Sequence, residues 1–310
     1  MQTRDHGGGI DNAIARFGGT RDDWIDLSTG INPVPYPIPS LPPDAWTALP
    51  DQAAFARLEA AARRFWAVPD EAAVLPATGA SAIIAALPRV LAGKTVDIAK
   101  PTYNEHAAAF AAAGWQVVSR DADAQVVVHP NNPDGRIWQA DDLHAGTVII
   151  DESFCDVIPD RSLIGLAGRP RHLVLKSFGK FWGLAGLRLG FIIGDPTLIA
   201  ALRDLLGPWQ VSGPALAIGA TALADEGWAD ATRSRLAADA ARLDRIMQVH
   251  GATPIGGTSL FRLYSVTDAK ALQDHLASRH IWTRIFPYSD NWIRLGLPAP
   301  DGWARLEAAL

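Results

Sequence analysis

The feature that most constrains this fold is a series of short, β-branched apolar runs between residues 73 and 194. The runs do not alternate with polar residues, as a strand with one solvent-exposed face would. Continuous runs of this length predict strands buried on both faces of a mainly parallel sheet. The runs occupy residues 73–75, 95–99, 116–118, 126–129, 147–150, 172–175 and 189–193.

The stretches between and after these runs predict the domain organisation. Helix-like segments at 81–91 and 104–113 fit the crossovers that parallel strands need. After residue 194 the pattern becomes helical and then turns to weaker strands, which is typical of a smaller α+β domain. The fold class is therefore α/β, with an N-terminal arm at 1–45, a large domain at 46–207 and a small C-terminal domain at 208–310. The later helices are expected at 196–206, 214–224, 229–250 and 269–278, and the later strands near 259–264 and 292–297.

The first 50 residues are rich in Gly and Pro, most densely at 32–39. Proline lacks the backbone donor that helix and sheet interiors need, so we expect these residues to run as an extended arm. An amphipathic helix at 53–66 should follow, since its apolar residues recur at helical spacing.

Composition excludes several function classes. The chain has 310 residues, 48% of them hydrophobic, and a net charge of −5, which argues against a nucleic-acid partner. No segment approaches the ~20 apolar residues of a membrane helix, and no apolar leader is visible, so a cytoplasmic protein is expected. The single Cys155 excludes an internal disulfide, and with no paired cysteines we expect no metal site.

Clusters of functional side chains follow most of the predicted strands. Ligands of open α/β sheets bind outside the carboxyl ends of the strands, so these clusters should meet in one crevice. Together they offer a lysine, an isolated acid, an asparagine, an aromatic ring and small residues that open a helix. This set suits pyridoxal phosphate (PLP), whose aldehyde, ring nitrogen and phosphate need such partners. The clusters are residues 78–81, 101–103, 129–133, 151–154 and 177–180.

Residues 177–190, with the sequence Ser-Phe-Gly-Lys-Phe-Trp-Gly-Leu-Ala-Gly-Leu-Arg-Leu-Gly, resemble the cofactor-lysine segment of fold-type I PLP enzymes. In that family a Ser or Thr stands three residues before the lysine and an Arg eight residues after it. Ser177, Lys180 and Arg188 match both spacings. The chain is most similar to the branch of histidinol-phosphate aminotransferase and threonine-phosphate decarboxylase. The segments 6–8, 26–33 and 180–183 favour the decarboxylase of cobalamin biosynthesis.

The resemblance implies a role for each cofactor residue. Lys180 would bind the cofactor covalently and later move protons, and Asp151 would pair with the ring nitrogen. Asn132 would donate to the phenolate oxygen, and Tyr103 would stack on the ring. The phosphate would be bound by Gly79, Ala80, Ser81, Ser177 and Arg188.

Each of these residues also has a structural interpretation. Lys176 lacks the Ser and Arg spacings, so we reject it as the cofactor lysine. Asn132 lies in a good turn sequence, and a buried core tyrosine remains an alternative for Tyr103. The histidines near these segments, His106, His129 and His172, have no metal-type spacing and are expected to be structural.

Two positions depart from the family pattern. Phe154 stands where many relatives have a Tyr that contacts the phenolate oxygen, which favours the decarboxylase branch. Leu49 replaces the Tyr of a Tyr-Pro-Asp segment that reaches the partner subunit's cofactor phosphate. That hydroxyl is therefore absent here.

The substrate-binding residues follow from the same resemblance. Arg294 and Arg284 match anion-binding arginines of the family, and the N-terminal arm folds over the substrate in its members. The implied set suits a small phosphorylated amino acid, and the implied assembly is a homodimer. The substrate-binding residues are expected to be His6, Gly7, Asn32, Asn132, Arg284 and Arg294.

The implied reaction is the PLP-dependent decarboxylation of L-threonine O-3-phosphate to (R)-1-amino-2-propanol O-phosphate. The same groups would perform transamination if the bond from Cα to hydrogen, rather than to the carboxylate, stood perpendicular to the ring. An aminotransferase of histidinol phosphate or an aromatic amino acid is therefore the alternative. A PLP-sensing regulator domain is disfavoured, since no basic DNA-binding extension precedes the predicted domain.

Overall fold

The computed structural model describes residues 6–310, whose contacts gather into two compact units. The large unit holds residues 36–132 and 136–231, and the small unit holds residues 6–35, 133–135 and 232–310. The compact units divide the chain at 35–36 and 231–232. The domain bounds expected from the sequence, at 45 and 207, stay a prediction.

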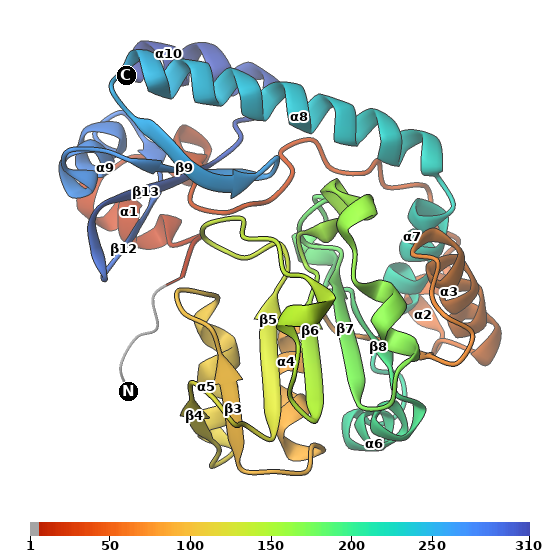
Figure 1. Ribbon diagram of the computed structural model, residues 1–310. Coiled ribbons are helices and arrows are strands. Elements are labelled where there is room, and N and C mark those ends of the chain that lie inside the picture. Colours follow the sequence, from red (N-terminus) through yellow and green to blue (C-terminus); the bar gives the residue numbers. More distant parts are fainter. Residues whose placement is uncertain (1–5) are drawn as a thin grey trace. The chain divides into compact units, whose positions relative to one another are not determined.

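A seven-stranded, mainly parallel sheet forms the centre of the large unit, in the order β2-β8-β7-β6-β5-β3-β4 (Figure 1). Neighbouring strands are parallel from β7 to β4, whereas β8 runs antiparallel to both β7 and β2. The predicted runs all form strands, displaced by no more than two residues at their ends. The strands are β2 (Ala73–Ala77), β3 (Thr95–Ile98), β4 (Gln116–Val118), β5 (Ala124–Val128), β6 (Thr147–Asp151), β7 (His172–Ser177) and β8 (Gly190–Gly194).

Both faces of this sheet are covered, as the continuous apolar runs require. On one face, alternate strand residues such as Val126, Ile149 and Leu173 form a core with residues of α4, α5 and α6. On the other face, α3 contacts β2, and a 3₁₀ turn, η6, contacts β7 and β8. The helices are α2 (Asp44–Thr47), α3 (Gln52–Phe65), α4 (Ala80–Ala86), α5 (Asn104–Ala112), α6 (Pro196–Leu206) and α7 (Gly213–Leu223); the 3₁₀ turns are η2 (Leu87–Arg89), η3 (Ala140–Asp142), η4 (Cys155–Val157), η5 (Pro159–Arg161), η6 (Ile164–Gly168) and η7 (Ala185–Leu187).

Helix starts in this unit follow local chemistry. The side chains of Asp51, Asp195 and Ser212 accept hydrogen bonds from the first turns of α3, α6 and α7. Proline follows at the first turn of α6 and α7, where no backbone donor is needed. These caps explain why the predicted ends of α6 agree with the structure.

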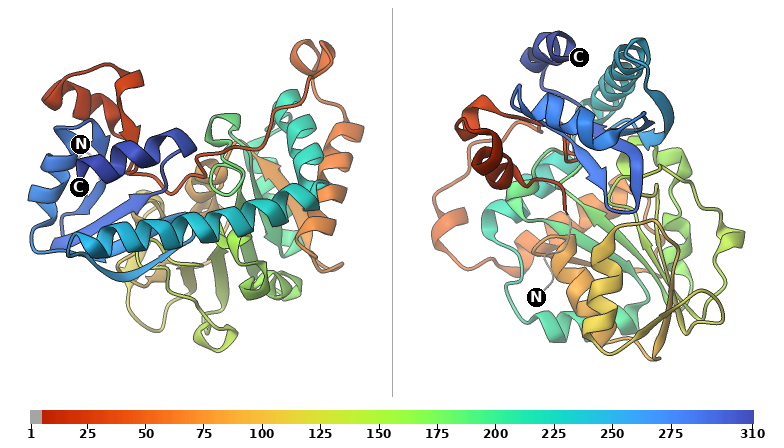
Figure 2. Two further views of the ribbon diagram at one scale, coloured as in Figure 1. Left: turned by 90° about the horizontal axis from the view of Figure 1, so that it is seen from above. Right: turned by 90° about the vertical axis from the view of Figure 1, so that its left-hand side faces the viewer.

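The small unit contains a four-stranded antiparallel sheet in the order β12-β13-β10-β9. Helix α8 (Glu226–Val249) packs on this sheet (Figure 2). Its Asp244 accepts hydrogen bonds from Arg262 and Tyr264 of β10. A two-stranded parallel pair, β1 (Ile25–Asp26) with β11 (Ile281–Trp282), joins the arm to the C-terminal residues. The remaining elements are η1 (Arg21–Asp23), α1 (Ile10–Phe17), β9 (Thr253–Thr258), β10 (Phe261–Ser265), α9 (Ala269–Ala277), β12 (Arg284–Phe286), β13 (Ser289–Gly296), η8 (Pro300–Gly302) and α10 (Trp303–Ala309).

The expectation of an extended arm is wrong for residues 10–17, which form α1. The glycines lie outside this segment, at Gly9 and Gly18, and Gly18 ends the helix with a positive φ of 79°. Ile10 and Ala13 are buried against Trp24 and Ala277. This tertiary contact stabilises a helix too short to form alone.

Strand β9 was not expected either, because Pro254, Gly256 and Gly257 interrupt its apolar pattern. The structure explains the glycines by a close backbone approach. A Cβ at Gly256 would lie 2.2 Å from the carbonyl oxygen of Asp134, and Gly257 donates its N–H to the same oxygen.

Among the described residues, no helix has the length and apolar character needed to cross a membrane.

Candidate active site

A cavity of about 190 Å³ lies within the large unit at the carboxyl ends of its parallel strands. It is bounded by the ends of β5, β6 and β7 and by the start of α4. The structure thus brings together the residues that the sequence predicts for the cofactor, with Gly79 directly preceding the lining residue Ala80. The predicted residues that line it are Ala80, Ser81, Tyr103, Asn132, Asp151, Ser177, Lys180 and Arg188.

Asp151 ends β6 and is only 2% exposed. Its Oδ1 accepts hydrogen bonds from the hydroxyl and the backbone N–H of Ser153, at 2.5 and 3.0 Å. Its Oδ2 lies 2.8 Å from Nε2 of His106. Burial alone would raise the pKa of Asp151, but the hydrogen bonds from His106 and Ser153 outweigh burial and lower the pKa below its usual value. The group is therefore a buried anion, suited to a cationic ring nitrogen.

The start of α4 and Arg188 form a cationic part of the cavity lining. Arg188 Nη2 donates to Ser81 Oγ at 2.9 Å, and its Nη1 donates to the carbonyl oxygen of Ala185 at 3.1 Å. Gly79 has a φ of 80°, and a Cβ there would lie 2.6 Å from Arg188 Nη2. The left-handed φ favours glycine at this position, and an arginine beside a helix start is a combination that can bind phosphate.

Lys180 also lines the cavity, in the turn that follows β7. It is half-buried, and its Nζ is 5.3 Å from the ring of Phe154. Lys176, which the sequence analysis rejected as the cofactor lysine, is buried and forms a 2.5 Å ion pair with Glu152. Lys180 is therefore the lysine of the cavity.

The loop that carries Asn132 is fixed by its neighbour. Asn131 accepts a hydrogen bond from Thr102 at 2.6 Å and donates to the carbonyl oxygen of Pro101 at 2.9 Å. Tyr103, the next residue in that segment, is half-buried and lines the same cavity. One set of hydrogen bonds thus orients the two segments that supply Asn132 and Tyr103.

These features fit PLP at each of its functional groups. A buried anion suits the ring nitrogen, an amine suits the aldehyde, and a helix start with an arginine suits the phosphate. The group would be bound by Asp151, Lys180, Asn132, Tyr103 and the Gly79–Ser81 and Ser177–Arg188 segments.

The predicted substrate arginines meet in the small unit. Arg284 of β12 and Arg294 of β13 are direct cross-strand partners. Arg294 is 5% exposed and donates to the carbonyl oxygen of Ser28 at 2.6 Å, and Arg284 donates to that of His6 at 2.8 Å. Burial, with a contribution from the like charge of Arg284, lowers the pKa of Arg294 to about 10.

Residues of the arm lie beside this pair. A Cβ at Gly7 would be 2.4 Å from the carbonyl oxygen of Ser28, so His6, Gly7, Arg284 and Arg294 form one cluster. Asn32 is also buried in the small unit, and its Oδ1 accepts a 2.6 Å hydrogen bond from Arg235 of α8. Like charges directly opposite one another in a sheet are destabilising, so the arginine pair favours an anion between them.

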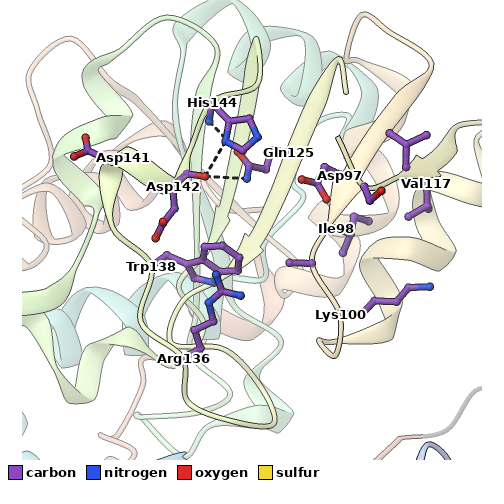
Figure 3. A pocket seen from close by; sticks show the side chains of 13 residues that line it. Asp97, Ile98, Lys100, Val117, Gln125, Arg136, Trp138, Asp141, Asp142 and His144 are labelled. Atoms are coloured by element: carbon purple, nitrogen blue, oxygen red, sulfur yellow. Dashed lines mark hydrogen bonds between the residues drawn. The ribbon is translucent and has the colours of Figure 1, made fainter. Parts of the chain in front are cut away.

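A larger concavity, of about 830 Å³, lies elsewhere in the large unit over β3 and β4 (Figure 3). Its side chains carry both charges, including Asp97, Lys100 and His144, and none of them belongs to the predicted motifs. Gln125 bonds to the backbone of Asp142 and His144, and Arg136 stacks 3.7 Å from the ring centre of Trp138. It does not offer the cofactor groups described above.

Within residues 6–310, His129, Glu152 and Cys155 form a buried cluster of metal-type side chains. Both ring nitrogens of His129 already have backbone partners, the carbonyl oxygen of Arg161 and the N–H of Trp138. Glu152 is paired with Lys176, and burial raises the pKa of the Cys155 thiol far above its usual value. These groups are therefore poor metal ligands.

Comparison with known proteins agrees with this site. Residues 120–302 match the family model described as aminotransferase class I and II. The chain is 42% identical to a threonine-phosphate decarboxylase of Pseudomonas aeruginosa, over 99% of this chain and 97% of that protein. A second one, from Sinorhizobium sp., is also 42% identical, over 98% of this chain and 97% of that protein.

This chain belongs to the aminotransferase class I and II family. It is a PLP-dependent enzyme of fold type I. Histidinol-phosphate aminotransferase of Sinorhizobium meliloti, solved with pyridoxal-5′-phosphate, has the same fold, with a TM-score of 0.81 and 19% identity over 97% of this chain and 92% of that chain. L-threonine-O-3-phosphate decarboxylase of Porphyromonas gingivalis has a TM-score of 0.73 and 17% identity, over 91% of this chain and 97% of that chain.

Three contacts of this aminotransferase-family site were not anticipated from the sequence. His106 was expected to be structural, yet it bonds the acid of the cavity. Ser153 bonds the same acid twice, and Arg235 bonds Asn32 across 203 positions of the chain. The position of Ser153 two residues after Asp151 is a turn signal that could have been used; the pairing of Arg235 with Asn32 has no local signal.

We expect His106→Phe to weaken the ionised state of Asp151. The lost hydrogen bond no longer offsets burial, so the pKa of Asp151 rises and its anion is lost at higher pH as the solution is acidified. The acid limb of kcat/KM should move to higher pH. At neutral pH kcat/KM should fall roughly tenfold or more, since a hydrogen bond to a buried charge contributes about 1.5–3 kcal/mol. A pH series of initial rates measures both effects.

His172→Phe is the matched control, because His172 begins β7 and its ring lies 2.8 Å from the nearby carbonyl oxygen of Pro170. Its acid limb should coincide with that of the unmodified enzyme. An unchanged limb in His106→Phe, or an equal shift in both variants, would contradict the assigned role.

Proposed function

We propose that the enzyme decarboxylates L-threonine O-3-phosphate to (R)-1-amino-2-propanol O-phosphate, a step of cobalamin biosynthesis. The observation that carries this proposal is the 42% identity, over nearly the full length of both chains, to two threonine-phosphate decarboxylases. The paired arginines of the small unit support it independently, because the substrate carries a phosphate and a carboxylate.

PLP supplies an electron sink that stabilises negative charge at the substrate Cα. Asp151, held as an anion by Ser153 and His106, would keep the ring nitrogen protonated so that this sink is effective. Lys180 would hold the cofactor through its aldehyde, and its amine, once free, would supply a proton to Cα. Asn132 would donate to the ring oxygen and hold the ring in orientation.

Substrate orientation then selects the bond that breaks. Arg284 and Arg294 bind the anionic groups of the substrate together with His6 and Gly7, and Asn32 and Asn132 donate further hydrogen bonds. By fixing the carboxylate, these residues would favour cleavage of the bond from Cα to the carboxylate carbon, so that CO2 would leave and Lys180 would supply the proton that Cα takes up. Phe154 in place of a tyrosine fits the decarboxylase branch.

Incubation with L-threonine O-3-phosphate should release CO2 and form an aminopropanol phosphate without a 2-oxo acid. The measurement is CO2 release together with product identification by mass spectrometry, in the presence and absence of 2-oxoglutarate. Transfer of the amino group to 2-oxoglutarate without CO2 would overturn the proposal in favour of an aminotransferase. Histidinol phosphate serves as the comparison substrate.

We expect Arg284→Met to lower kcat/KM for threonine phosphate by roughly 10- to 150-fold. A charge-assisted hydrogen bond contributes about 1.5–3 kcal/mol, and every ~1.4 kcal/mol is tenfold. The loss should be smaller for unphosphorylated threonine, and steady-state rates with both substrates measure it. Arg245→Met, at an exposed arginine of α8, is the control; equal losses in both variants would remove Arg284 from the phosphate site.

We further propose that the enzyme acts as a homodimer. Large apolar side chains of the large unit are exposed in two segments, among them Trp46 at 70%, Leu49 at 67% and Trp209 at 54%. Exposed apolar side chains that gather in one patch often mark a surface that binds another protein. A second copy of this chain is the proposed partner, and the cytoplasmic location stays a prediction.

Sedimentation velocity should find a dimer at micromolar concentration. Trp46→Ser should shift the equilibrium towards monomer, because it removes a large apolar contact from the proposed interface. Val249→Ser, which changes an exposed apolar residue at the end of α8, is the control. A monomeric unmodified enzyme, or equal behaviour of the two variants, would exclude this surface as the interface.

A further inference from the structure

A buried cluster of charges lies behind the cofactor cavity and takes no part in the chemistry above. It consists of Lys176, Glu152 and Asp156, which are 2%, 1% and 4% exposed. Lys176 Nζ lies 2.5 Å from Glu152 Oε2 and 3.7 Å from Asp156 Oδ1. Burial by itself would lower the pKa of Lys176, but the two carboxylates reverse this and raise it above the usual value.

The two carboxylates have further hydrogen-bond donors. Glu152 accepts from the Ser162 hydroxyl at 2.7 Å and from the Leu163 N–H at 2.5 Å. Asp156 accepts from the indole N–H groups of Trp66 and Trp182, at 2.9 and 3.2 Å. Every charge of the cluster is thus satisfied, and the cluster has one fixed arrangement.

Each link of the cluster adjoins a residue of the cofactor cavity. Glu152 follows Asp151 at the end of β6, and Lys176 precedes Ser177 at the end of β7. Because successive strand residues point to opposite faces, the ion pair lies on the face opposite to the cavity. Trp182, which is fully buried between Phe178 and Trp228, lies two residues after Lys180.

We propose that Lys176 is a positioning residue for the cofactor, since its ion pairs fix the three segments that carry Asp151, Ser177 and Lys180. A buried ion pair contributes little to stability compared with apolar residues of the same size. Its contribution here is the fixed geometry of the ring-nitrogen partner, a phosphate ligand and the covalent attachment point relative to one another.

The test measures cofactor binding rather than turnover, so its outcome does not depend on the proposed substrate. The principal variant is Lys176→Met with Glu152→Gln, which removes the ion pair but leaves the net charge of the cluster at −1. The glutamine still offers an oxygen to the Leu163 N–H, and its NH2 group can donate to the Ser162 hydroxyl oxygen. Two quantities are measured: the dissociation constant of PLP from its visible absorbance, and the rise in Tm when PLP binds the apoenzyme.

We expect the dissociation constant of PLP to rise roughly tenfold or more in this double variant. Loss of a residue that orients a metal ligand weakens metal binding by about this factor, and Lys176 would act on the cofactor in the same indirect way. The PLP-induced rise in Tm should shrink accordingly, and Lys176→Arg, which retains the charge, should stay close to the unmodified enzyme. Lys94→Met, at an exposed lysine, is the matched control and should change neither quantity.

A double variant with lower apoenzyme Tm but unchanged PLP affinity would overturn the proposal and leave the cluster a purely structural one. If the double variant does not fold, Trp182→Phe decides the question, because it removes the indole N–H that links Asp156 to the Lys180 segment and keeps an aromatic ring between Phe178 and Trp228. Its PLP affinity should fall, and an unchanged affinity would equally overturn the proposal.

Discussion

A carboxylate buried at the end of a central strand is the constraint on which this site depends. Asp151 could not remain charged at 2% exposure without compensation, because an unpaired buried charge is costly. His106 and Ser153 supply three hydrogen bonds, and a cationic cofactor ring would supply the remaining counter-charge. The parallel sheet provides this position, since the other cofactor segments end at the same edge.

The seven strands of the large unit could be predicted from the sequence. Its strands are continuous apolar runs, and the helices that follow begin at recognisable caps such as Asp195 and Ser212. The cofactor residues follow the strands in sequence, so the rule that ligands bind at the carboxyl ends of strands was enough to group them. Local pattern and tertiary position coincide in this part of the chain.

The small unit, and residues such as His106 that bond to the predicted site residues, were harder to predict from the sequence, for a physical reason. α1 is stabilised by contacts with Trp24 and Ala277, the latter more than 250 residues away, and β9 carries glycines that a loop contact requires. His106 sits on a helix with no pattern to distinguish it from a core histidine; only the fold places it against Asp151. Contacts made between distant segments leave no periodic trace in the sequence.

The closeness of Gly79 to Arg188 limits how this site can vary. Arg188 itself has a left-handed φ of 54°, a conformation that costs a non-glycine residue energy, and its guanidinium occupies the volume that a side chain at position 79 would need. Gly79 has a φ of 80°, so a side chain there would be strained even if the arginine were shortened. A change of anion specificity would therefore have to keep glycine at position 79 and vary the arginine instead.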